Sequence, residues 1–97
     1  MADSYISRTA DAIRTAAGDD DGHDLLYLVY AVLALAKGEQ VTASDVHDAW
    51  SAVAQYEGAA GGAVVPFAEL PVALQERDEP FAEAVRAVSR ALRVSNG

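Results

Sequence analysis

The sequence predicts an all-α fold, a compact bundle of helices around one buried apolar helix. Residues 25–36, LLYLVYAVLALA, form a run whose only polar groups are two tyrosine hydroxyls. Apolar residues also recur at helical spacing elsewhere, and alanine, the strongest helix former, fills 21 of 97 positions against three prolines. We therefore predict four main helices in a single domain, 1–97, at about 3–17, 24–37, 42–57 and 80–94.

The first two helices are joined by an acidic loop, 18–24. Its carboxylates lack the spacing of a calcium-binding loop, so we interpret Asp21 or Asp24 as the N-cap of the second helix. Gly18 is expected to end the first helix, and Lys37 with Gly38 to end the second. Because the second helix is apolar all round, we expect its neighbours to cover every side of it.

The third helix has the clearest start signal. Thr42 and Asp45 have the spacing of a capping box, and Val41 with Val46 that of a hydrophobic staple. The predicted apolar stripe is Val46, Ala49, Trp50, Val53 and Tyr56. His47 lies off this stripe and is expected to face solvent or a groove edge.

The remaining chain predicts an extended strap, 63–70, that crosses the core and contains Pro66. Pro71 is expected to open a short helical turn, 71–76, and Asp78 or Glu79 to start the final helix. The predicted buried face of that helix is Phe81, Ala84, Val85, Val88 and Leu92.

Composition and charge exclude several classes of function. The chain has no cysteine, and its net charge of −8 opposes direct binding to nucleic acid. The three arginines at 86–97 predict a small basic strip. The run at 25–36 is about 18 Å long as a helix, too short for a bilayer core of roughly 30 Å, and no secretory signal is visible. We expect a soluble cytoplasmic protein that does not bind membranes.

No catalytic or metal-binding motif is recognisable. The serines lie in ordinary helical patterns, and the glycines at 58–62 run into a proline-containing strap rather than a phosphate-binding helix. His23 and His47 have no third metal ligand at a fixed spacing. We therefore expect no enzyme activity, no cofactor and no metal.

Three segments resemble a known family. Residues 46–50 (VHDAW), 64–70 (VVPFAEL) and 76–78 (ERD) are similar to the repeat of ryanodine receptors and of small bacterial and phage proteins. The resemblance covers about residues 41–94. The turn rich in tryptophan and glycine that often follows the first helix of that repeat is replaced in this chain at 55–57 (QYE). The whole chain looks like uncharacterised acidic proteins of actinobacteria and their phages. The resemblance implies a role in binding rather than catalysis.

His47 and Trp50 are the main candidate site residues. With Phe67 and Glu69 from the strap they would form a groove for a protein partner or a small nucleotide-like ligand. Alternatively, Trp50 anchors the strap and His47 donates a hydrogen bond to a strap carbonyl, a structural role that we favour.

Two functions follow. The first is a non-enzymatic accessory module that binds a partner or ligand through this region, with a homodimer through the first or last helix as an option. The second is an acidic mimic of nucleic acid that blocks a host DNA-binding protein; for a phage-encoded chain, the location is the host cytoplasm.

Overall fold

The computed structural model describes residues 4–19, 23–58 and 64–96, and these contain helices and no strand. The elements are α1 (Tyr5–Ala17), α2 (Asp24–Lys37), the 3-10 turn η1 (Gly38–Gln40), α3 (Ala43–Tyr56), the 3-10 turn η2 (Phe67–Glu69), α4 (Val72–Glu76) and α5 (Glu79–Asn96). The prediction of an all-α bundle with four main helices is confirmed. No helix within the described ranges is both long and apolar enough to cross a bilayer.

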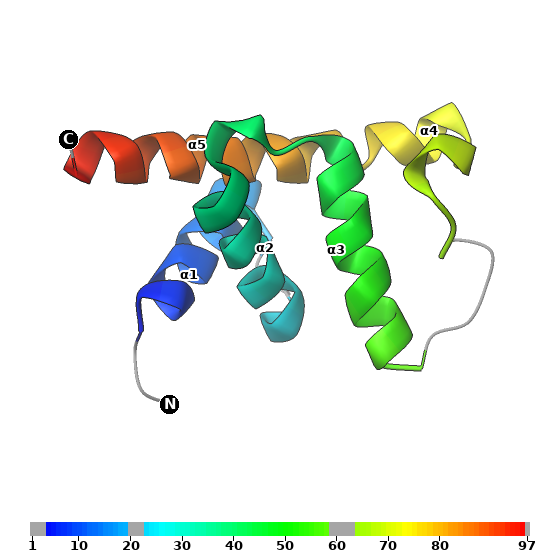
Figure 1. Ribbon diagram of the computed structural model, residues 1–97, viewed down its shortest axis with the longest axis horizontal. Helices are drawn as coiled ribbons and strands as arrows, with labels where there is room; N and C mark the ends of the chain where they lie inside the picture. The colour runs from blue at the N-terminus through cyan, green and yellow to red at the C-terminus, as the bar shows by residue number, and fades with distance from the viewer. Residues whose placement is uncertain (1–3, 20–22, 59–63, 97) are drawn as a thin grey trace.

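Helix α5 forms the long side of the molecule (Figure 1). It packs against α1, α2 and α3, while α1 and α2 form a hairpin beside it. The short α4 lies near the beginning of α5, next to α3. The described chain measures 41 × 28 × 22 Å along its principal axes.

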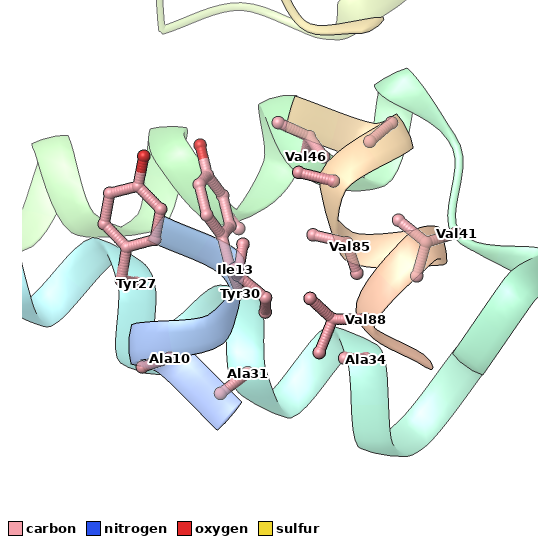
Figure 2. Close-up of a cluster of buried hydrophobic side chains, with 13 residues drawn as sticks. Ala10, Ile13, Tyr27, Tyr30, Ala31, Ala34, Val41, Val46, Val85 and Val88 are labelled. Atoms are coloured by element: carbon pink, nitrogen blue, oxygen red, sulfur yellow. The ribbon is translucent and has the colours of Figure 1, made fainter. Parts of the chain in front are cut away.

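Small side chains dominate the core between these helices (Figure 2). Its buried members are Ala10, Ile13, Tyr27, Tyr30, Ala31, Ala34, Val41, Val46, Ala49, Ala82, Ala84, Val85 and Val88. Because alanine and valine project little from the backbone, the helices approach closely, and the two tyrosines supply most of the bulk. The predicted buried face of α5 contributes Ala84, Val85 and Val88 to this core.

The prediction that α2 is covered on every side is wrong. Its buried residues form one stripe, Tyr27, Tyr30, Ala31 and Ala34, whereas Val32 is 53% and Leu35 47% exposed. The physical reason is that the helices α1, α3 and α5 cover only part of the circumference of α2.

The predicted N-cap of α2 also needs correction. His23 occupies the cap position without a capping hydrogen bond from its side chain, and Asp24 is the first helical residue. The Asp24 carboxylate instead accepts a hydrogen bond from Arg14 at 2.7 Å. The other candidate, Asp21, lies outside the described residues. Gly18 ends α1 in the left-handed conformation, as predicted, and donates to the carbonyls of Arg14 and Thr15.

The capping box of α3 is confirmed. The Asp45 N–H donates to the Thr42 hydroxyl at 3.2 Å, and the Thr42 N–H donates to the Asp45 carboxylate at 2.9 Å. Burial alone would raise the pKa of Asp45, but hydrogen bonds from Lys37 and Thr42 outweigh burial and hold that pKa below its usual range. Val41 and Val46, the predicted staple, are fully buried. At the other end of α3, Tyr56 is 82% exposed, so its predicted place on the apolar stripe is wrong.

The strap is less extended than predicted. Its described part bends at Val64 and Val65 and then forms η2 after Pro66, whose carbonyl accepts from the Glu69 N–H at 2.9 Å. The short helical turn after Pro71 is present as α4, although it begins one residue later than predicted, at Val72.

The basic strip predicted on the last helix does not form. Arg86 pairs with Glu79 and Glu83 on α5 and also donates to the Val41 carbonyl at 2.8 Å. Arg90 and Arg93 both pair with Glu39 of η1. These contacts neutralise the arginines and fasten α5 to the connection between α2 and α3.

Thr42→Ala tests the capping box. Removing the hydroxyl that accepts from the Asp45 N–H should lower the free energy of unfolding by about 1 kcal/mol, measured by urea denaturation. Ser44→Ala is the matched control, because Ser44 lies in the same first turn and its side chain makes no hydrogen bond within the described chain. Equal losses in the two variants would contradict a special role for the cap.

Candidate functional site

A cavity of about 370 Å³ lies between α2, α3, α4 and the start of α5. Such a volume is within the range of small-molecule sites. Its lining residues are Asp19, Leu26, Tyr30, His47, Trp50, Leu70, Leu74, Arg77, Asp78 and Phe81. The cavity is therefore built from segments that are far apart in the sequence.

Hydrogen bonds to backbone carbonyls hold the strap against the helices. His47 Nε2 lies 2.6 Å from the Val65 carbonyl oxygen, and the Gln75 side-chain amide donates to the carbonyls of Phe67 at 3.0 Å and Leu70 at 3.1 Å. The prediction that His47 faces solvent or a groove edge is corrected in part: only 4% of this residue is exposed, although it lines the cavity. The hydrogen bond to a strap carbonyl, as in the structural alternative, is present.

Aromatic rings surround His47. Its imidazole stacks on the Trp50 indole, with centroids 5.8 Å apart and planes 22° apart, and its centroid is 6.1 Å from that of Phe67. The rings of Tyr30 and Phe81, 6.2 Å apart, also line the cavity.

The four predicted site residues do not all meet in the cavity. His47 and Trp50 line it, while Phe67 contacts His47 but lines a separate hollow with Thr42 and Gln75. Glu69 is exposed and lines neither. The predicted groove requires an extended strap that brings Glu69 beside His47. The strap instead forms the 3-10 turn η2 at Phe67–Glu69.

Asp78 is the main site residue absent from the prediction. Its Oδ2 lies 3.7 Å from His47 Nδ1, and its side chain is 19% exposed. Desolvation raises the pKa of Asp78 above its ordinary value, although His47 and Arg77 oppose that shift. Burial also raises the pKa of Tyr30, and the charge of Asp78 adds to this effect. The sequence predicts only that Asp78 or Glu79 starts the last helix, because the nearness of Asp78 to His47 depends on how α3 and α5 pack.

His47 lies between Ser51 and Asp78, as the histidine of a hydrolase triad lies between its serine and its aspartate. The proton on His47 is nevertheless in the wrong place for such a triad. His47 Nε2 is 3.3 Å from Ser51 Oγ and 2.6 Å from the Val65 carbonyl. A carbonyl only accepts, so Nε2 carries the proton of the shorter bond. A nitrogen that already carries a proton does not remove one from Ser51.

No group of three or more metal-ligating side chains occurs in the described ranges 4–19, 23–58 and 64–96. The cavity nevertheless holds carboxylates, an imidazole and aromatic faces, which suit an organic ligand.

Comparison with known proteins identifies the family. A family model described as a domain of unknown function, DUF7701, matches residues 4–90. The chain belongs to this family. The match covers all of the cavity-lining residues. No curated protein and no solved structure matches the chain significantly.

His47→Ala tests whether His47 holds the strap against α3. Loss of the hydrogen bond to Val65 and of the buried ring should lower the free energy of unfolding by about 2–3 kcal/mol, measured by urea denaturation. The control is His23→Ala, because His23 is half-exposed and pairs with exposed Glu57, so its loss should cost less than about 1 kcal/mol. Similar decreases in the free energy of unfolding in the two variants would argue against a role of His47 in holding the strap.

Asp78→Asn should stabilise the protein at neutral pH. Because the pKa of Asp78 is raised in the folded state, its ionisation opposes folding as pH rises above the unfolded value of about 3.9. Below that value the carboxyl is protonated in both states and the advantage of the variant should disappear. Urea midpoints measured between pH 3.5 and 7 check this, and a variant that is less stable than the wild type at pH 7 would contradict it.

Proposed function

We propose that this protein is a non-enzymatic binding module whose ligand, or a side chain of whose protein partner, enters the cavity between α2, α3, α4 and α5. One observation carries the proposal: a partly buried carboxylate, Asp78, is kept in an aromatic cavity where burial disfavours its charge. Ionisable groups that are buried at a cost in stability are typical of functional sites.

A role in binding rather than catalysis is supported by His47. Its Nε2 proton is directed to Val65, and its ring is packed between Trp50 and Phe67. This imidazole therefore acts as a fixed wall rather than as a base that exchanges protons with Ser51.

The finer features of the proposal come from the sequence. The resemblance to the ryanodine-receptor repeat and to proteins of actinobacteria and their phages supports an accessory role in the cytoplasm, or in the host cytoplasm for a phage protein. The sequence suggests a protein or a small nucleotide-like ligand as the partner. A homodimer stays part of the proposal because Tyr5 on α1 and Val94 on α5 are exposed.

The alternative of an acidic nucleic-acid mimic ranks second. Many carboxylates are already engaged within the chain: Asp11 and Asp24 with Arg14, Asp45 with Lys37, Glu39 with Arg90 and Arg93, and Glu79 and Glu83 with Arg86. A mimic must present its charges to a partner. Its complexes should dissociate as salt rises, whereas a ligand held in the cavity should remain bound.

A cavity-filling variant tests the proposal. In a fragment screen by amide-correlation NMR, hits should shift the Trp50 indole resonance in the wild type. Leu74→Trp should abolish these shifts by filling the cavity, because Leu74 lines it. Val72→Trp on the same helix should retain them, because Val72 is 67% exposed and lies outside the cavity. Hits that bind Leu74→Trp as well as wild type, or a screen without hits, would contradict the proposal.

A further inference from the structure

Two polar side chains of the cavity lining, His47 and Asp78, face each other. Since the Nε2 proton of His47 is donated to Val65, Nδ1 of the neutral ring carries a lone pair. It faces the Asp78 carboxylate at 3.7 Å, too far for a direct hydrogen bond. Two facing acceptors repel unless a hydrogen lies between them. A ligand N–H placed between them would supply that hydrogen.

Three aromatic rings line the cavity together with this pair. Trp50, Tyr30 and Phe81 line the same cavity as His47 and Asp78. Faces of aromatic rings carry negative charge density and attract cations, most strongly where water is excluded. A planar group with positive charge therefore fits both the rings and the carboxylate.

The charged side chains of the lining also favour a cation over an anion. Among the lining residues Asp19 and Asp78 are acids, and Arg77 is the one arginine or lysine. Asp19 accepts a hydrogen bond from the Tyr27 hydroxyl at 2.8 Å. Arg77 is exposed and forms no ion pair with Asp78 within 4 Å. A phosphate would meet two carboxylates here, whereas a cation meets a net negative wall.

We infer that the cavity binds a planar organic cation, an amidinium or guanidinium group, with its N–H bonds directed at Asp78 and His47 Nδ1 and its plane against Trp50. The inference rests on the proposed binding function and names the ligand class of the same cavity. The group would belong to a free small molecule or to an arginine side chain of a protein partner.

Three probes of the same shape and different charge test the inference. Benzamidinium is a cation, benzamide is neutral and benzoate is an anion. Trp50 is the only tryptophan, so its fluorescence reports binding directly. We expect benzamidinium to bind saturably at pH 7 and the other two at least tenfold more weakly. The peptide acetyl-Gly-Arg-Gly-amide is a further probe: tighter binding than benzamidinium favours an arginine side chain as the natural group, and weaker binding favours a free molecule.

Asp78→Asn should weaken benzamidinium about tenfold or more, because a charged hydrogen-bond partner becomes neutral. Asp48→Asn is the matched control, since Asp48 is an exposed acid on α3 outside the cavity lining, and should bind as wild type. Equal loss in both variants would show a general effect of charge and overturn the inference.

Two negative results would distinguish a failure of the cation inference from a failure of the proposed binding function. If benzamide or benzoate binds as well as benzamidinium, and Leu74→Trp abolishes this binding, the cavity is a binding site but its ligand is not a cation. If none of the probes binds, the cation inference is overturned, and the fragment screen then decides whether the cavity binds anything.

Discussion

The small size of the core side chains sets the architecture. The buried core of the described chain is mostly alanine and valine, whose short side chains let neighbouring helices approach closely. The larger rings of Tyr30, Trp50 and Phe81 line the cavity, and Tyr30 also belongs to the core. Three of the seven aromatics in the 97-residue chain therefore lie at one cavity beside this core.

The hydrogen bond between His47 and Val65 connects this core to the cavity. It holds the strap on α3, fixes which imidazole nitrogen carries the proton, and leaves the other nitrogen facing Asp78. The same contact therefore has a structural and a chemical effect. The two interpretations of His47 that the sequence allowed, an anchor and a wall of a binding groove, are compatible in this geometry.

Local signals in the sequence predicted the helix ends well. Both the signals and the caps that they predict involve residues only a few positions apart. Thr42 with Asp45 marks the start of α3, and Gly18 marks the end of α1. Burial was predicted less well. The run at 25–36 shows that α2 is apolar, but the number of neighbours around it decides that Val32 stays exposed. The site was predicted in part, since His47 and Trp50 share one helix, whereas Asp78 reaches them only through the packing of α5.

Under the proposed binding function, occupancy of the cavity is coupled to folding. Its walls come from α2, α3, α4 and α5, so it exists only when all of these segments are assembled. A ligand of this kind of site binds the native chain and not the unfolded one, and at a hundredfold excess over its Kd it adds about 2.7 kcal/mol to stability. In a cell, the amount of intact protein would then follow the supply of the ligand, because the unfilled chain unfolds more often and is degraded sooner.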